Sequence, residues 1–337
     1  MLKKIIIIGS GVSGLAAALR LSVKGYQVTV FESNKYIGGK ISELRYNGYR
    51  FDTGPSLFTV PKLIDELVEI SGCKSLNFFE YTKLNINCRY FFNDGTIINA
   101  YSDRTKFVKE ASGKTNVSSR AIDNYLKYVS FLYKSTNKIF IEKSLHKLST
   151  YLSFQTFISF IKIPFLNIFT TMNKVNSKRL KNNKLIKIFN RFATYNGSNP
   201  YVAPGILNVI SHLEFNEGVF LPNKGMRSIA ECLHQMCLKN GVVFKMNSKV
   251  TKISLNNDRV DGVYVKEKYY SSDLVVSNID IFYVYHNLLN QPNYFKKNIL
   301  LEKSTSAIIF YWGVNKEFKK LDLHNILFSK DYEREFN

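Results

Sequence analysis

A run of four isoleucines that leads directly into three glycines is the feature of this chain that most restricts its fold. In IIIIGSGVSG, the residues Ile5–Ile8 are apolar enough for a strand buried on both faces. The following LAAALRLSVKG has the small and apolar residues of a helix that packs on a sheet, and YQVTVFE is a second strand that ends at Glu32. A strand, a helix and a strand in this order predict a βαβ unit, and hence an α/β fold with a parallel sheet.

The three glycines have the spacing of a dinucleotide-binding fingerprint. Gly9 allows the tight turn after the strand, Gly11 lets the backbone approach a pyrophosphate at the helix N-terminus, and Gly14 lets the helix pack closely on the strand. Glu32 lies eighteen residues past Gly14, where a carboxylate accepts hydrogen bonds from ribose hydroxyls. This part of the sequence therefore predicts a nucleotide cofactor.

A second glycine pair, Gly38 and Gly39, comes six residues after Glu32 and is followed by Lys40. The pair indicates that the backbone approaches a ligand a second time, with Lys40 meeting a phosphate. An ordinary turn is the alternative. A site for NAD alone requires none of these residues, so they favour FAD. The stretch GYRFDTGPS comes next and contains the candidate residues Gly54, Pro55 and Ser56.

The longer stretch GSGVSGLAAALRLSVKGYQVTVFESNKYIGGKISELRYNGYRFDTGPS resembles the extended FAD motif of the flavin amine oxidase and phytoene desaturase superfamily. Within it, the chain is most similar to bacterial carotenoid desaturases, which include phytoene desaturases and 1-hydroxycarotenoid 3,4-desaturases. The resemblance continues, in order, through RFATYNGSNPYVAPGILNVISHLEFNEGVFLPNKGM, GVVFKMNSKVTKI, DLVVSNID and IFYWGVNKEFKKLDLHNILFS. It implies an FAD-dependent oxidoreductase that introduces C=C bonds into a carotenoid precursor. A flavin amine oxidase and an inactive remnant stay open as alternatives.

The resemblance also implies an FAD-binding Rossmann-like domain of the glutathione-reductase type with an inserted α+β substrate domain. Residues 1–82 and 218–285 would form the FAD-binding domain, 83–217 the substrate and membrane-facing domain, and 286–337 a return to the substrate domain. Val250 would contact the adenine side of FAD through its backbone, besides being a core strand residue. The expected cofactor-binding residues are Gly9, Ser10, Gly11, Ser13, Gly14, Glu32, Ser33, Gly39, Lys40, Gly54, Pro55, Ser56 and Val250.

Two departures from the family pattern bear on these expectations. Lys224 and Gly225 stand where family members usually have a glycine pair. Relatives also continue well beyond the position of Asn337 and close the flavin site with a glycine-rich segment. The chain is therefore expected to be a C-terminally truncated member, either a fragment or a shortened product that is inactive.

Desaturation removes two hydrogens from adjacent carbons, and a flavin accepts a hydride whereas no side chain does. The protein then supplies orientation and excludes water. Arg191, which could stabilise a developing charge, and Glu214, which could act as a base, flank a family-like loop and are the candidate catalytic residues. A structural ion pair is the alternative for both. The aromatic residues of the insertion are expected to line an apolar substrate tunnel or to form an ordinary core.

The histidines and cysteines argue against a metal site. The five histidines are scattered, and the four cysteines form no CxxC pair. The cysteines are expected to be free thiols of a protein in a reducing compartment.

The chain has 47 basic against 26 acidic residues, which gives a formal net charge of +21. The basic residues are scattered and indicate a compositional bias, with attraction to an anionic membrane surface as the alternative. No nucleic-acid-binding signature is present, so nucleic acid is not an expected partner. The apolar segment Leu148–Met172 is interrupted by polar residues and by Pro164, and is expected to be buried or to lie on a membrane face. The sequence predicts a cytoplasmic, peripherally membrane-associated protein and leaves its oligomeric state open.

Overall fold

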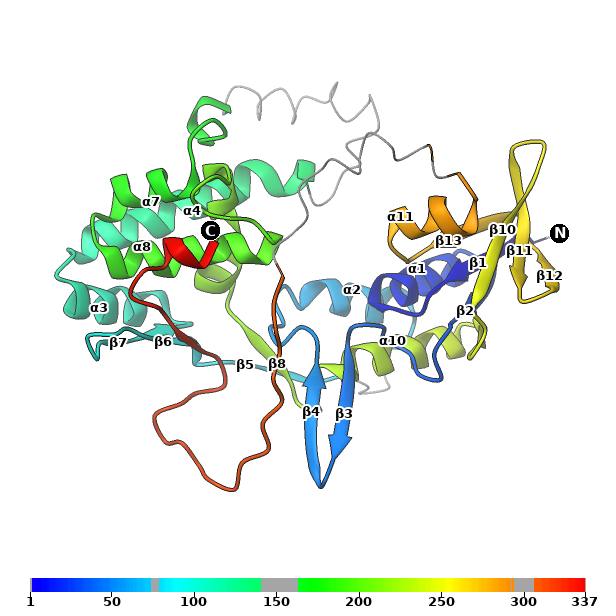
Figure 1. Cartoon of the computed structure of the whole chain (residues 1–337), viewed down its shortest axis with the longest axis horizontal. Coiled ribbons are helices and arrows are strands. Elements are labelled where there is room, and N and C mark those ends of the chain that lie inside the picture. Colours follow the sequence, from blue (N-terminus) through cyan, green and yellow to red (C-terminus); the bar gives the residue numbers. More distant parts are fainter. Residues whose placement is uncertain (1, 74–78, 141–162, 292, 294–305, 337) are drawn as a thin grey trace. The chain divides into compact units, whose positions relative to one another are not determined.

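The computed structural model describes residues 2–73, 79–140, 163–291, 293 and 306–336 (Figure 1). The chain forms two compact units, one of Met1–Thr82 with Phe220–Glu302 and the other of Lys83–Val219 with Lys303–Asn337. It passes between these units after residues 82, 219 and 302. The domain boundaries expected from the sequence come after residues 82, 217 and 285, so the two divisions coincide at the first boundary and differ most at the third.

A parallel sheet of four strands organises the first unit (Figure 1). Its order is β13-β1-β2-β9, and each neighbouring pair is parallel. β1 has a neighbour on each side and is buried along Ile5–Ile8, which explains its run of isoleucines. The predicted βαβ unit and α/β fold class are confirmed. The four strands are β13 (Leu274–Ser277), β1 (Lys4–Ile8), β2 (Gln27–Phe31) and β9 (Val243–Lys245).

Helix α1 (Val12–Val23) connects β1 to β2 and packs beside α10 (Arg227–Lys239). Leu15, Ala18 and Leu19 are fully buried on the inner face of α1 and share a hydrophobic core with residues of α10. The small side chains of LAAALRL therefore let the helix lie close to the sheet, as the sequence predicts.

The remaining elements of the first unit are a hairpin, a helix, a two-stranded ladder, a three-stranded antiparallel sheet and two short helices. They are β3 (Ser42–Tyr46) with β4 (Tyr49–Thr53), α2 (Lys62–Ile70), β5 (Tyr81–Lys83) with β8 (Phe220–Pro222), then β10 (Val250–Asn256), β11 (Arg259–Val265) and β12 (Lys268–Ser271), and finally α11 (Ile281–Tyr283) and η6 (Val284–Leu288).

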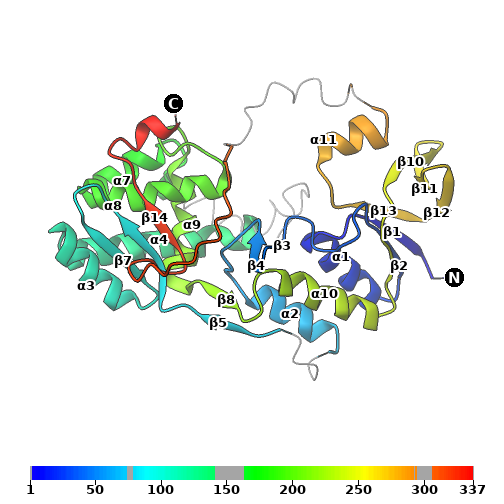
Figure 2. The same cartoon turned by 60° about the horizontal axis from the view of Figure 1, so that its bottom comes forward.

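The second unit has a three-stranded sheet of order β14-β6-β7 beside a group of helices (Figure 2). β6 (Ile86–Phe91) and β7 (Ile97–Tyr101) are antiparallel, and β14 (Asn325–Leu327) joins β6 in parallel. The helices are α3 (Arg104–Thr115), α4 (Ser119–Phe140), η2 (Ile163–Phe165), α7 (Met172–Leu180), α8 (Asn183–Asn190), η3 (Arg191–Asn196), η4 (Gly205–Val209), α9 (Ile210–His212), η5 (Leu213–Glu217) and η8 (Glu333–Phe336).

Aromatic side chains fill the core of the second unit. Their rings contact one another at tilted, stacked and edge-on angles, for example Phe107 with Phe215 and Tyr125 with Phe189. In the part of the insertion that the structure describes, these residues serve a packed core rather than a tunnel wall. The fully buried aromatics are Tyr90, Phe107, Tyr125, Phe189, Phe192 and Phe215.

Among the described helices, none is both long and apolar enough to cross a membrane. Of the apolar segment Leu148–Met172, residues 148–162 lie outside the described residues. The remainder forms η2, a loop and the start of α7.

Candidate functional site

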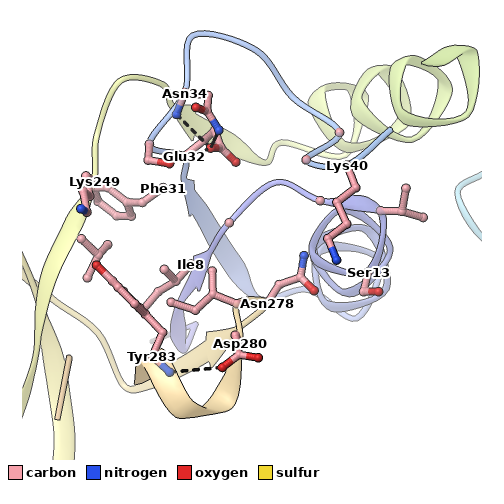
Figure 3. Close-up of a pocket in the computed structure, with 18 of the residues that line it drawn as sticks. Ile8, Ser13, Phe31, Glu32, Asn34, Lys40, Lys249, Asn278, Asp280 and Tyr283 are labelled. Atoms are coloured by element: carbon pink, nitrogen blue, oxygen red, sulfur yellow. Dashed lines mark hydrogen bonds between the residues drawn. The ribbon is translucent and has the colours of Figure 1, made fainter. Parts of the chain in front are cut away.

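A pocket of about 860 Å³ opens at the carboxyl ends of β1, β2 and β13 in the first unit (Figure 3). This is the edge of a parallel sheet at which ligands bind in open α/β folds. The residues that line it are Ile8, Gly9, Gly11, Val12, Ser13, Phe31, Glu32, Ser33, Asn34, Gly38, Gly39, Lys40, Ile41, Ser248, Lys249, Val250, Asn278, Ile279, Asp280 and Tyr283.

The turn from β1 into α1 requires glycine at two positions, for different reasons. Gly9 has φ +93°, which disfavours any other residue, and its N–H donates to the Phe31 carbonyl at 2.8 Å. A Cβ on Gly14 would lie 2.2 Å from the Gly9 carbonyl oxygen, so Gly14 is required for close packing. Gly11 is the N-cap of α1 and no side chain caps the first turn. The N–H groups of that turn therefore remain suited to an anionic ligand.

The second glycine pair meets the first. The Gly38 N–H donates to the Ser10 carbonyl at 2.9 Å, and Gly38 and Gly11 form an isolated parallel bridge. A Cβ on Gly39 would lie 3.3 Å from the Gly11 Cα. The pair is thus more than a turn: it places two side-chain-free segments of backbone against each other at one wall of the pocket, next to Lys40.

Glu32 is 5% exposed and has a hydrogen bond on each carboxylate oxygen. Oε2 accepts from the Ser10 N–H at 2.8 Å and the Ser10 hydroxyl at 2.7 Å. Oε1 accepts from the N–H and the side-chain amide of Asn34, both at 2.9 Å, and from the Ser33 hydroxyl at 3.2 Å (Figure 3). Burial opposes ionisation, but these hydrogen bonds outweigh it and hold the pKa of Glu32 below its ordinary value. The carboxylate is therefore ionised and held in place.

We expect Glu32→Gln to lower the free energy of unfolding at neutral pH by about 2 kcal/mol, because an amide cannot accept hydrogen bonds at both positions. Since the folded pKa is lowered, the contribution of Glu32 is present above pH 4.5, the unfolded value, and is lost as the pH falls through the folded pKa. Urea unfolding at neutral pH and near pH 4 measures both effects. Glu66→Gln, at a half-exposed carboxylate, is the control, and equal losses in the two variants would contradict the prediction.

Five of the expected cofactor-binding residues lie outside the pocket lining. Ser10 is buried behind it and holds Glu32, and Gly14 packs against the Gly9 backbone. Gly54 has φ +98°, and a Cβ there would lie 2.1 Å from the Lys40 carbonyl oxygen, so its role in the described structure is to support Lys40. Pro55 and Ser56 are exposed. The other eight, Gly9, Gly11, Ser13, Glu32, Ser33, Gly39, Lys40 and Val250, line the pocket.

The residues after β13 contribute a wall that was missing from the expected site. Asn278 lies beside the glycine turn, where its side-chain nitrogen would be 2.8 Å from a Cβ on Gly11. Asp280 caps α11: it accepts from the Phe282 N–H at 2.9 Å and from the Tyr283 N–H at 3.3 Å, and Figure 3 shows the second of these bonds. The stretch DLVVSNID could have indicated this wall. Polar residues that follow a buried parallel strand lie at the same edge of the sheet as the residues that follow β1.

The candidate catalytic residues belong to the second unit and form a buried ion pair. Arg191 Nη2 lies 2.6 Å from Glu214 Oε2, and the two side chains are 7% and 2% exposed. The Arg191 Nε–H donates to the Tyr90 hydroxyl at 2.9 Å, and the Tyr195 hydroxyl donates to Glu214 Oε1. Burial opposes the charge of Arg191, but Glu214 raises the pKa of the guanidinium well above its ordinary value. This arrangement fits the alternative that the two residues form a structural ion pair. A catalytic role for the pair stays a prediction.

The described residues contain no group of histidines, cysteines and acids that could hold a metal ion. All four cysteines are free and buried. Burial raises the pKa of Cys88 and Cys232 to about 11 and that of Cys237 to about 12, so these thiols are protonated and unreactive near neutral pH.

The chain has relatives of known name along nearly its whole length. It is 46% identical to the 1-hydroxycarotenoid 3,4-desaturase of Flavobacterium sp. (strain P99-3), over 99% of this chain and 68% of that protein. It is 30% identical to the 4,4'-diaponeurosporene oxygenase of Staphylococcus haemolyticus, over 99% and 67%, and 31% identical to the phytoene desaturase of Phycomyces blakesleeanus, over 99% and 58%. The chain thus spans between 58% and 68% of the length of these relatives.

Solved structures share the fold. An oxidoreductase from Methanosarcina mazei superimposes with a TM-score of 0.56 at 19% identity, over 85% of this chain and 61% of that one. A putrescine oxidase bound to putrescine gives a TM-score of 0.57 at 13% identity, over 86% and 60%. Identities this low establish the fold alone.

The sequence profile of the family described as flavin containing amine oxidoreductase matches residues 12–322. The family profile and the named relatives confirm the predicted resemblance to carotenoid desaturases, the FAD cofactor and the class of FAD-dependent oxidoreductases. With its two glycine segments and its buried acid in place around the pocket, the chain belongs to the flavin containing amine oxidoreductase family.

Proposed function

We propose that this chain provides the FAD pocket and much of the substrate domain of a carotenoid desaturase. The observation that carries the proposal is the meeting of the two glycine segments beside buried Glu32, in a chain 46% identical to a 1-hydroxycarotenoid 3,4-desaturase. An ordinary turn at Gly38 and Gly39 would not require this contact, whereas a pyrophosphate that lies against both segments needs backbone without side chains there.

The residues of the pocket fit the separate parts of FAD. The first-turn N–H groups of α1 and the Lys40 ammonium would hold the pyrophosphate. Glu32 would accept hydrogen bonds from ribose hydroxyls in place of some that it now accepts from its own chain. Val250 would contact the adenine side through its backbone, since its side chain is buried in the core. Gly54, Pro55 and Ser56 are proposed to continue the flavin path beyond Lys40, the residue whose backbone Gly54 contacts.

When bound, FAD supplies the hydride acceptor that the reaction needs. Each new C=C bond breaks two C–H bonds, so that one hydrogen leaves as a hydride and the other as a proton. Glu214 could take that proton only if its hydrogen bonds with Arg191 and Tyr195 opened. We therefore propose that the main role of this pair is to hold the substrate domain together, and that proton acceptance by Glu214 is secondary.

The similarity favours a hydroxylated carotene as the substrate, because identity is 46% to the 3,4-desaturase and 31% to a phytoene desaturase. Incubation of the FAD-loaded chain with a 1-hydroxycarotenoid and, separately, with phytoene tests this choice. The expected result is a red shift of the polyene absorbance with the hydroxylated substrate. A shift with phytoene alone would instead identify phytoene as the substrate.

The cofactor step is tested separately by titrating the purified chain with FAD and recording the visible spectrum. We expect bound yellow flavin. Flavin binding together with hydrogen peroxide release from putrescine, and no change in any carotenoid, would identify an amine oxidase. A colourless chain in excess FAD would overturn the proposal in favour of an inactive remnant.

A long apolar polyene resides in the membrane, so we also propose that the protein works at a cytoplasmic membrane surface as a peripheral protein. The basic composition supports this, since it favours an anionic surface.

A further inference from the structure

Two loops of the second unit expose apolar side chains that the core does not use. Before α7, Leu166 and Ile168 pack on the core, whereas Phe165, the last residue of η2, is 65% exposed and Phe169 is 96% exposed. In the loop before η4, Ala203 is buried and its neighbour Val202 is 69% exposed. We call Phe165, Phe169 and Val202 the apolar tip.

Backbone hydrogen bonds hold the two loops side by side. The Met172 N–H donates to the Ala203 carbonyl at 2.8 Å, and the Gly205 N–H donates to the Thr170 carbonyl at 2.7 Å. The first loop is also tied to α4, because the Asn167 amide donates to the Tyr128 hydroxyl at 2.8 Å. These hydrogen bonds therefore hold the two loops in place, and the exposed side chains of the tip are available for contact with another surface.

The segment of chain that carries the tip has charges of one sign, while the acids Asp331, Glu333 and Glu335 of a later segment act on Tyr201, the neighbour of Val202. Between Glu142 and Glu214 the sequence contains no acidic residue. The exposed residues Lys174 and Lys178 are one turn apart on α7, so they share a face of that helix. Arg179 and Lys181 are exposed next to them, and the Arg179 guanidinium lies over the Tyr128 ring at 3.7 Å. We call these four cations the basic rim.

We propose that the apolar tip inserts into the interfacial layer of a bilayer while the basic rim binds anionic lipid headgroups. The inference rests on the membrane association proposed above and assigns it to particular residues. Exposed phenylalanines beside lysines and arginines are typical of interfacial anchors, since apolar burial and attraction to anionic lipid act together. A second copy of this chain is a poorer partner for the tip, because its rim would bring the same charge to the contact.

Flotation of the full chain with lipid vesicles, after FAD loading, tests the assignment. We expect binding to phosphatidylcholine vesicles that contain a third phosphatidylserine, and much weaker binding to pure phosphatidylcholine. Each lysine near such a surface is worth about a fivefold change in partitioning, so Lys174→Glu with Lys178→Glu is expected to weaken binding at least 25-fold, which is about the product of the two. Phe165→Ser with Phe169→Ser is expected to weaken it about tenfold or more.

Matched variants separate this surface from a general charge or aromatic effect. Lys106→Glu with Lys109→Glu makes the same charge change at exposed sites of α3, and Tyr46→Ser removes an aromatic side chain that is 68% exposed in the first unit. Both controls are expected to bind vesicles as the parent does. Equal losses in the controls, or equal binding to both kinds of vesicle, would overturn the assignment to this surface. The flavin spectrum of each variant reports the cofactor proposal independently, and light scattering without lipid would reveal self-association as the competing outcome.

Discussion

Gly11→Val is expected to weaken FAD binding at least a hundredfold, or by about 2.7 kcal/mol, without unfolding the chain. Gly11 has φ −62° and ψ 169°, a conformation that valine adopts readily, so the backbone tolerates the change. The new side chain would instead enter the place where the first turn of α1 faces the second glycine segment. Quenching of flavin fluorescence on titration measures the loss.

Two further variants make this result specific. Gly113→Ala is the matched control, because no atom lies within 4 Å of a Cβ built there. Asn278→Ser, combined with Gly11→Ala, removes the side-chain atom that a Cβ at Gly11 would meet at 2.8 Å. If weak FAD binding persists in the double variant, the cause is the lost approach of pyrophosphate to the backbone and not the clash with Asn278. Unchanged affinity in Gly11→Val would refute the assignment of the pocket.

Replacing either member of the buried ion pair alone, by Arg191→Met or Glu214→Leu, is expected to destabilise the second unit by about 3–5 kcal/mol. Each change leaves the other charge in the interior, where its side chain is at most 7% exposed. The double variant is expected to lose less than the sum of the two single losses, since it leaves no unpaired charge. Chemical denaturation of the four proteins gives the coupling energy.

The half-exposed pair of Arg20 and Glu66 provides the control for this cycle. Arg20→Met is expected to cost less than about 1 kcal/mol, because water screens such pairs. Losses of similar size at Arg191 and Arg20 would rule out the structural role. A Glu214→Gln variant that keeps full stability and flavin binding but loses desaturation would instead favour Glu214 as a base.

The local parts of the fold and site could be predicted from the sequence. The strand, glycine turn, helix and acid of the first βαβ unit lie within about thirty residues, and each follows from residue chemistry together with its neighbours. Gly9, Gly11 and Glu32 therefore line the pocket as expected. The hydrogen bonds of Ser10 to Glu32 were not predicted, because a motif gives spacing but not which side chains saturate a carboxylate.

The long-range parts could not be predicted in the same way. Asn278 reaches the glycine turn only because β13 pairs with β1, and nothing near Asn278 in the sequence reports that pairing. An ion pair of Arg191 with Glu214 was one of two interpretations, and the structure shows that pair buried, while a catalytic role stays a prediction. For Gly54, the sequence indicates that another group approaches the backbone closely but does not say which group. The structure shows that this group is the backbone of Lys40.

The register of β1 has a consequence for how this chain is made. Ile5 pairs with Val28 on one side and with Leu274 on the other, so one edge of β1 has no partner strand until residues much later in the sequence have been synthesised. Until that point, the nascent chain on the ribosome has an apolar strand with one unpaired edge. Such an edge favours aggregation and the binding of chaperones. The lining of the pocket runs from Ile8 to Tyr283, so FAD meets all of its lining residues only after translation has passed Tyr283.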